Sequence, residues 1–284
     1  MRFSLVLATV GRTKELERFL HSLQAQTYRN FELIIVDQNV DGRIVPLIDQ
    51  FGASFPITHL KTPYKGASRA RNLGLRYAKG DIVAFPDDDC VYSPELLWGV
   101  SRFFHNNPNE EVLIVKVKDL EGHDFPMQPR TAGRVSFWMM WHLSMSVALF
   151  VRRSVIQQVA FDEQIGLGAG TPWGSGEDTD FGLRALKMGF RIWYDPSLWV
   201  AHPVGPLPLE KARIYGRGSG YVLRKHGAWG KFAWAIARRG AGVLLYTLSG
   251  RREEAMWRWE ALKGTIQGFF RMGARKRKRV RRPH

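Results

Sequence analysis

The chain has 284 residues, of which 45% are apolar and 24% are charged. This composition is that of a globular protein, and it excludes wholesale disorder and a collagen-like repeat. A single cysteine, Cys90, excludes an intramolecular disulfide framework and fits a reducing compartment. Residues 1–8 lack a cleavage-site pattern, so we expect a buried strand there and no signal peptide.

The net charge of +16 is concentrated at one end of the chain. Residues 1–204 contain 22 Lys and Arg and 22 Asp and Glu, so this part is neutral. Residues 205–284 contain 20 Lys and Arg and four acids, which accounts for the whole excess. A neutral body with a basic carboxyl-terminal part indicates that the last 80 residues meet an anionic surface.

Four short apolar runs in the amino-terminal third predict buried strands, at 3–8, 31–36, 57–60 and 81–85. Helices are predicted between and after them: one carrying Leu16, Phe19, Leu20 and Leu23 at helical spacing, one over 66–78, and one from Ser93-Pro94-Glu95. Strands that alternate with helices favour an α/β fold with an open, mostly parallel sheet.

Polar residues stand at the carboxyl ends of three predicted strands, namely Thr9, Asp37 and residues 87–89. Ligands of open α/β sheets bind beyond the carboxyl ends of the strands. The sequence therefore predicts one site, built from three separate segments at one edge of the sheet.

Three consecutive aspartates, Asp87, Asp88 and Asp89, would raise one another's pKa if they were held close together. A divalent cation relieves that repulsion, and oxygen ligands suit Mg²⁺ or Mn²⁺. The alternative interpretation is a solvated acidic turn in front of the next helix.

A second acidic cluster follows two glycines in the segment GSGEDTD, residues 174–180. Glycine allows close approach of the backbone to a ligand, and a carboxylate beside a metal–phosphate site can act as general base towards a hydroxyl. The alternative is an ordinary acidic first turn of a helix, which the helix dipole favours.

The chain resembles family 2 glycosyltransferases of the GT-A fold. The segments that carry the resemblance are 9–12 (TVGR), Asp37, 66–72 (GASRARN), 80–89 (GDIVAFPDDD), 161–163 (FDE), 176–180 (GEDTD) and His202. Together they span roughly residues 3–203. The resemblance implies a nucleotide-sugar donor, usually a UDP-sugar, and inversion at the anomeric carbon.

The same resemblance implies roles for single residues. Expected donor contacts are Thr9, Gly11, Arg12, Asp37, Arg71, Asp87 and Asp88. Expected ligands of Mn²⁺ or Mg²⁺ are Asp89, Asp87 and His202. Asp178 is the expected catalytic base, and Glu177 would orient the acceptor or Asp178. The alternatives are that His202 merely ends a strand and that Arg71 is a surface cation of a helix.

Two positions depart from the family's pattern. Pro86 stands where an apolar residue is common before the aspartates, which affects the turn geometry. Gln38-Asn39 follow Asp37 where a serine-rich stretch is frequent, which affects selectivity for uracil.

Residues 136–151 (SFWMMWHLSMSVALFV) are strongly apolar but too short for a membrane span. The family pattern implies a strand near 146–151. The aromatic residues and methionines before it are interpreted either as the lining of an acceptor pocket or as ordinary core.

Beyond Pro208 the pattern is helical. An apolar face is predicted from Met256, Trp259, Leu262, Ile266 and Phe269. A basic helix with such a face is typical of a membrane surface, and the basic run 275–282, expected to be disordered, would add attraction to anionic lipid. Packing against the catalytic body or against a second copy in a homo-oligomer is the alternative.

We therefore expect a GT-A catalytic domain over 1–204, with a nucleotide-sugar-binding half to about 110 and an acceptor half over 111–204. A helical membrane-associating or dimerising extension over 205–272 and a basic tail over 273–284 complete the chain. The expected activity is transfer of a sugar to a lipid-linked or cell-surface glycan in polysaccharide biosynthesis, by a cytoplasmic enzyme peripheral on the inner face of the membrane. The rival hypotheses are nucleic-acid binding through the basic tail, which the neutral body does not favour, and a catalytically silent nucleotide-sugar-binding relative.

Overall fold

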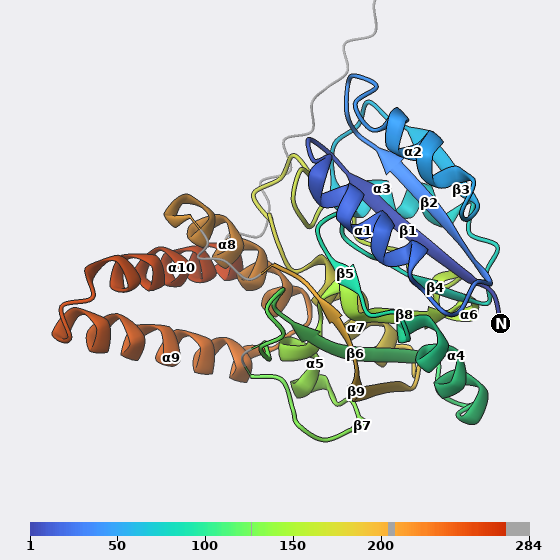
Figure 1. Cartoon of the computed structure of the whole chain (residues 1–284). Coiled ribbons are helices and arrows are strands. Elements are labelled where there is room, and N and C mark those ends of the chain that lie inside the picture. The colour runs from blue at the N-terminus through green and yellow to red at the C-terminus, as the bar shows by residue number, and fades with distance from the viewer. Residues whose placement is uncertain (126, 204–207, 271–284) are drawn as a thin grey trace, which may run out of the picture. The chain divides into compact units, whose positions relative to one another are not determined.

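The structure is a computed structural model that describes residues 1–125, 127–203 and 208–270 (Figure 1). The chain divides into two compact units. The first contains Met1–Thr171 and Glu177–Pro206, and the second contains Pro172–Gly176 and Leu207–His284. The predicted boundary at 204 and the predicted basic tail over 273–284 fall outside the described residues. The sequence did not indicate that Pro172–Gly176 would group with the carboxyl-terminal helices.

Nine strands of the described chain form one sheet in the first unit. One half is parallel, in the order β3-β2-β1-β4. Its strands are β1 (Phe3–Thr9), β2 (Phe31–Asp37), β3 (Ile57–Lys61) and β4 (Ile82–Ala84). The apolar residues of β1, β2 and β4 are buried, except Ala8, which is partly exposed. Continuous apolar runs are typical of parallel strands that are covered on both faces. This half agrees with the four predicted strands.

The other half of the sheet is mixed in direction. Its strands are β8 (Leu149–Arg152), β6 (Val112–Lys118), β9 (Ile192–Ala201), β5 (Val91–Tyr92) and β7 (Gly133–Arg134). The strand pattern did not predict β9, because Pro196 interrupts it and proline is rare inside strands. The pairing of β9 with β6 is irregular there, passing from Asp195 to Trp199.

The helices of the first unit are α1 (Lys14–Gln24), α2 (Val45–Gly52), α3 (Ala67–Leu75), α4 (Leu96–Asn106), α5 (Phe137–Leu143), α6 (Arg153–Ile156) and α7 (Glu177–Lys187). The predicted apolar stripe of α1 is completely buried. The predicted cap of α4, Ser93, lies two residues before the observed N-cap, Glu95. The carbonyl of Ser93 accepts from the amide of Leu96, so residues 93–95 form a turn before the helix.

The apolar segment 136–151 does not form one element. It contains α5, a single 3₁₀ turn (Ser146–Ala148) and then β8, so the strand begins at Leu149 and not near 146. Met140 and Leu143 are buried, whereas Trp138 is exposed. The segment thus contributes to both the core and the surface.

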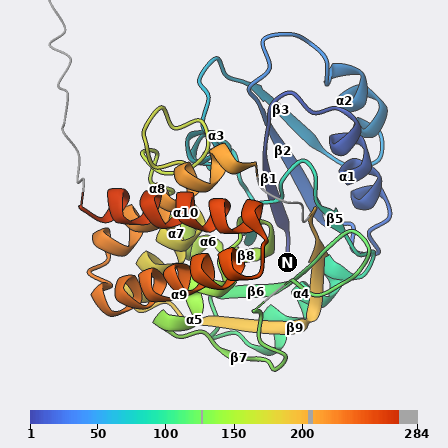
Figure 2. The same ribbon diagram turned by 90° about the vertical axis from the view of Figure 1, so that its left-hand side faces the viewer.

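The described part of the second unit contains three helices, α8 (Leu209–Lys225), α9 (Trp229–Leu248) and α10 (Arg252–Phe270). In Figure 2, α9 and α10 run side by side. The short segment before α7 also belongs to this unit. In it, the Ser175 hydroxyl donates to the Tyr215 carbonyl at 2.9 Å, and the Trp173 ring stacks on Tyr221 at 4.6 Å between centroids.

Helices α8 and α10 pack through small residues. A Cβ added to Gly220 would lie 2.1 Å from the Thr265 carbonyl oxygen, and one added to Gly216 would lie 2.4 Å from the Ala261 carbonyl oxygen. Only glycine leaves room for such close backbones. No helix of the described residues is long and apolar enough to cross a membrane.

The apolar face predicted for α10 is divided between the core and the surface. Leu262 and Phe269 are buried, but Met256, Trp259 and Ile266 are exposed. The face that packs on α8 is instead rich in small residues, namely Ala261, Gly264, Thr265 and Gly268.

Candidate active site

The three segments predicted to converge do meet at one edge of the sheet. Thr9 pairs with Asp37 at the ends of β1 and β2. Ala8 forms an isolated parallel bridge with Asp87, just beyond β4. The parallel register therefore brings the acidic cluster beside the end of β1.

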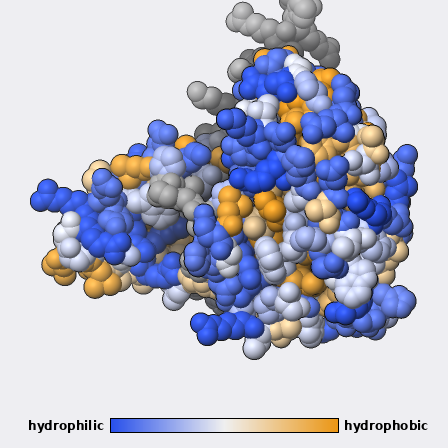
Figure 3. Space-filling view, in the orientation of Figure 1, coloured by the Kyte–Doolittle hydropathy of each residue, from blue (hydrophilic) through white to orange (hydrophobic). Residues whose placement is uncertain are grey.

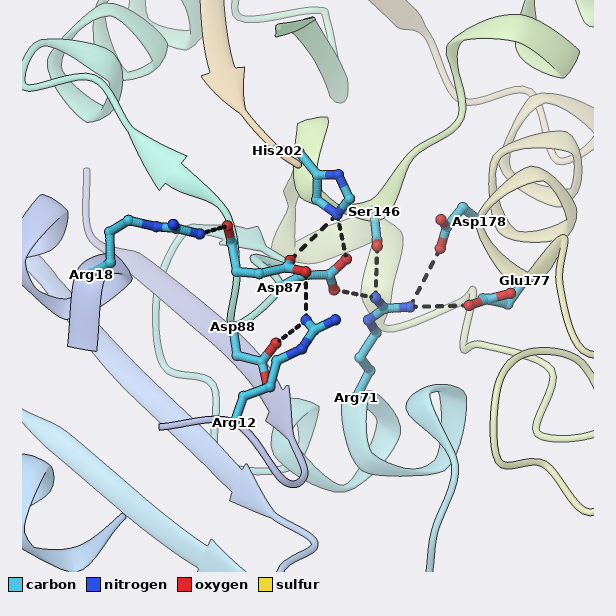
Figure 4. A network of polar contacts seen from close by, with 10 residues as sticks. Arg12, Arg18, Arg71, Asp87, Asp88, Ser146, Glu177, Asp178 and His202 are labelled. Atoms are coloured by element: carbon cyan, nitrogen blue, oxygen red, sulfur yellow. Dashed lines mark hydrogen bonds and ion pairs between the residues drawn. The ribbon is translucent and has the colours of Figure 1, made fainter. Parts of the chain in front are cut away.

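Asp88 is held by Thr9 at the end of β1 and by Arg12 in the turn that follows. The Thr9 hydroxyl donates to its Oδ2 at 2.7 Å. The Arg12 guanidinium donates to its Oδ1 at 2.7 Å (Figure 4). Burial raises the pKa of Asp88, although these two partners act in the opposite direction. Arg12 also donates to Oδ2 of Asp89 at 2.5 Å, so a single cation bridges two neighbouring carboxylates.

Arg71 of α3 is only 3% exposed, so it is not a surface cation. Its Nη2 donates to Asp87 Oδ1 at 2.8 Å and to the Ser146 hydroxyl at 2.6 Å. Its Nη1 lies 3.4 Å from Asp178 Oδ1 and 3.7 Å from Glu177 Oε1. One guanidinium thus joins the aspartate cluster to the acidic pair of α7 (Figure 4).

Glu177 and Asp178 form the first turn of α7. Burial raises the pKa of Glu177 to about 7, with a further rise from the charge of Asp178 and an opposing effect of Arg71. Burial also raises the pKa of Asp178. The loop over Glu177 requires glycine, because Gly166 has a φ of +109° and a Cβ there would lie 3.0 Å from the Glu177 carboxyl carbon.

His202 follows β9 and faces the aspartates. Its Nε2 lies 3.4 Å from Asp89 Oδ1 and 3.8 Å from Asp87 Oδ2. Ligand atoms of the three residues all lie within 4.8 Å of one another. Asp89 Oδ1 is buried and has no hydrogen-bond partner in the described part of the chain. Two carboxylates, one of them with an unsatisfied oxygen, and one imidazole fit a divalent cation such as Mn²⁺.

A second group of similar spacing consists of Asp119, Glu121 and His123 on the loop after β6. His123 and Glu121 are exposed, and Nδ1 of His123 lies 2.9 Å from Asp119 Oδ2. This group is a locally paired turn that begins directly after Lys118, the residue whose carbonyl accepts from the His202 amide.

Asp37 is completely buried at the end of β2. Its Oδ1 accepts from both the backbone and the side-chain nitrogen of Asn39, each at 2.8 Å. Its Oδ2 lies 3.0 Å from Nε2 of His59. Asn39 in turn accepts from the Gly11 amide at 2.7 Å. Through Asn39, Asp37 therefore helps to hold the turn that follows β1. Its role as a nucleoside contact stays a prediction.

Several polar residues around the site were not predicted. They are Asn39 and His59 at Asp37, Gln38, which accepts from the Gly66 amide, Arg18, which donates to the Asp89 carbonyl, and Ser146. For Gln38 and Asn39, the departure from the family's pattern was the feature of the sequence that could have indicated a place at the site. Ser146 had no signal beyond being a polar residue in an apolar segment.

The sheet, its covering helices and the acidic cluster beyond the strand ends are those of the GT-A fold. The solved structures that resemble this chain agree. TarS of Staphylococcus aureus, residues 1–349 in complex with UDP-GlcNAc, superimposes with a TM-score of 0.62 at 17% identity, covering 96% of this chain and 93% of that one. The mannosyltransferase PcManGT from Pyrobaculum calidifontis, in complex with GDP-Man and Mn²⁺, gives a TM-score of 0.66 at 14% identity, covering 95% and 87%.

The sequence profile described as glycosyl transferase family 2 matches residues 4–155, more than half of the chain. The chain therefore belongs to glycosyl transferase family 2, and the predictions of family, enzyme class and GT-A fold are confirmed.

Two curated relatives are similar in sequence. An uncharacterized glycosyltransferase of Haemophilus influenzae is 31% identical over 191 residues, which is 65% of this chain and 62% of that protein. The poly(ribitol-phosphate) beta-N-acetylglucosaminyltransferase TarS of Staphylococcus aureus is 27% identical over 142 residues, which is 48% of this chain and 25% of TarS. The chain thus spans less than two thirds of the length of either relative.

Proposed function

We propose that the chain transfers a sugar from a UDP-sugar, with inversion, to a hydroxyl of a lipid-linked or cell-surface glycan. The observation that carries this proposal is the Arg71 network, which ties the aspartate cluster to Glu177 and Asp178. A donor diphosphate site and a proton acceptor are then neighbours, as an in-line transfer requires. TarS, which was solved with UDP-GlcNAc and whose name gives poly(ribitol phosphate) as its acceptor, supports a UDP-sugar donor and a hydroxyl-bearing polymer as acceptor.

Asp178 is the proposed base. Its carboxylate takes the proton of the acceptor hydroxyl while the acceptor oxygen bonds to the anomeric carbon. The bond between that carbon and the diphosphate oxygen breaks, and UDP leaves with the electron pair. Burial raises the pKa of Asp178, which makes it a stronger proton acceptor than an exposed aspartate once it is ionised. Glu177, across Arg71, orients the acceptor or Asp178.

Asp89, Asp87 and His202 are the proposed ligands of Mn²⁺ or Mg²⁺. When bound, such a cation supplies positive charge to the leaving diphosphate. Arg71 and Arg12 hold the carboxylates in place from the other side. Thr9, Gly11, Arg12, Asp37, Arg71, Asp87 and Asp88 are the proposed donor-binding residues.

We assign catalysis to residues 1–204 and association with the inner face of a membrane to 205–284. The twenty cations of the last 80 residues support that location, because they attract anionic lipid. A lipid-linked glycan that serves as acceptor in polysaccharide biosynthesis would lie at this membrane surface.

The test compares Asp178→Asn with Asp49→Asn, which removes an exposed carboxylate on α2. UDP release is measured with a panel of UDP-sugars, alone, with glycan acceptors and with poly(ribitol phosphate). We expect Asp178→Asn to lower turnover by a factor of about 10²–10⁴ and to leave UDP affinity unchanged, while Asp49→Asn behaves as wild type. Full turnover in Asp178→Asn would remove Asp178 from the role of base.

A further inference from the structure

Helix α9 carries an apolar stripe that the second unit leaves exposed. Gly242 is the only buried residue of this 20-residue helix. The exposed side chains that recur every three or four residues define the α9 stripe: Trp234, Ala237, Ala241, Leu244, Leu245 and Leu248. Leu244, Leu245 and Leu248 are 66%, 67% and 85% exposed. Hydrophobic surface is visible at the left-hand end of α9 in Figure 3.

Two cations flank the tryptophan of the stripe. The Lys231 ammonium lies 5.0 Å from the centroid of the Trp234 ring, and the Arg238 guanidinium lies 5.2 Å from it. An indole with cations beside it combines an apolar body with a charged rim. This combination is enriched where a membrane surface meets water.

The whole unit is basic around this stripe. Residues 208–270 contain twelve Lys and Arg but only four acids. Two of these acids are engaged by cations of the same unit. Glu254 pairs with Arg251, and Glu260 pairs with Arg213 and Lys263. Residues 208–270 therefore carry a net positive charge, to which Lys231 and Arg238 beside Trp234 contribute.

This charge selects among the partners that an apolar stripe can have. A second copy of the chain in a symmetric contact would bring the same positive surface against itself, which is unfavourable. An anionic bilayer offers both an apolar interior and negative headgroups. Lys231, Arg238 and Arg239 make α9 unsuitable to span a membrane but suitable to lie in its interface.

We propose that the α9 stripe inserts into the headgroup region of an anionic lipid bilayer, with Lys231 and Arg238 at the lipid phosphates. The inference rests on the proposed function only in taking the membrane as the place of the acceptor. It names the surface that makes the contact and the lipid charge that the contact requires.

The test uses the full chain, so that the basic residues 271–284 are the same in every sample. Binding to sonicated vesicles is measured by co-sedimentation, with phosphatidylcholine alone and with 30% phosphatidylglycerol added. The variant Leu244→Ser/Leu248→Ser removes apolar surface from the stripe. Its control, Tyr77→Ser/Met188→Ser, removes two exposed apolar side chains of the first unit. We expect at least about tenfold weaker binding to anionic vesicles for the stripe variant and wild-type binding for the control.

A charge arm uses Lys231→Glu/Arg238→Glu, with Lys14→Glu/Arg29→Glu of the first unit as control. The first pair should lose binding to anionic vesicles, and the control should lose much less. Binding of all variants to pure phosphatidylcholine should be weak.

Wild-type vesicle binding by Leu244→Ser/Leu248→Ser would overturn the proposal. It would also be overturned if light scattering found a wild-type dimer that this variant converts to a monomer while vesicle binding persists. UDP binding, followed by calorimetry in every variant, separates the two proposals. If UDP fails to bind the wild type, the proposed function fails and the vesicle result still stands.

Discussion

His202 and Asp89 come from distant parts of the chain, and Nε2 of the one lies 3.4 Å from Oδ1 of the other. Oδ2 of Asp87 faces the same imidazole nitrogen at 3.8 Å. The other oxygen of each aspartate is bound by an arginine, Arg12 on Asp89 and Arg71 on Asp87. Each carboxylate thus keeps one oxygen turned towards the histidine, which is the arrangement a bound cation would use.

His202→Asn should weaken the Mn²⁺-dependent binding of UDP by at least about tenfold, because one of three ligands is lost. The matched control is His123→Asn in the group Asp119, Glu121 and His123, which has similar spacing but lies on an exposed loop. Calorimetry with and without Mn²⁺ gives both values. Equal losses in the two variants would contradict the assignment of His202.

Arg71→Met should lower the free energy of unfolding by about 3–5 kcal/mol, because it leaves buried carboxylates without their cation. Arg69→Met, two residues earlier on α3, removes a half-exposed arginine 3.4 Å from Glu163 and should cost less than about 1 kcal/mol. Urea unfolding of both variants checks the difference. A small effect at Arg71 would mean that the network contributes little to the fold.

The raised pKa of Glu177 makes stability depend on pH. Burial raises this pKa from 4.5 to about 7, so in that interval the folded chain holds a proton that the unfolded chain has released. Stability therefore declines as pH rises from about 4.5 to 7. In EDTA, Glu177→Gln should be more stable than wild type at pH 8 by on the order of 1–3 kcal/mol and equal to it near pH 4. Glu121→Gln, at an exposed position, should show no such crossover.

Gly220→Ala should destabilise the second unit by about 1–3 kcal/mol, because its Cβ would meet the Thr265 carbonyl oxygen at 2.1 Å. Gly240→Ala is the control within α9, where an added Cβ meets nothing within 4 Å. That change should stabilise by roughly 0.5–1 kcal/mol, since alanine favours helix. Thermal unfolding followed by circular dichroism distinguishes the two. Equal effects would show that α8 and α10 do not pack this closely.

Local patterns predicted the parts of the fold in which neighbours along the chain decide the structure. The apolar run of β1 and the helical spacing of Leu16, Phe19 and Leu20 are of this kind. The acidic segments could be assigned because their order matches a family. The strand ends then brought Asp37 and Asp87 to one edge through the parallel register.

Other features depend on contacts that no local pattern carries. Ser146 binds Arg71 from a distant segment, and nothing in its surroundings distinguishes it from a core residue. Strand β9 contains Pro196 and pairs irregularly. The packed face of α10 consists of small residues, which amphipathic patterns overlook although they permit the closest contacts.

The central claim is that the edge of the sheet binds a nucleoside diphosphate with a divalent cation. The most direct measurement is calorimetric titration of UDP, GDP and dTDP into the full chain, each with and without Mn²⁺. We predict that UDP binds and that its binding depends on Mn²⁺. Failure of all three to bind a protein that circular dichroism finds folded would contradict it.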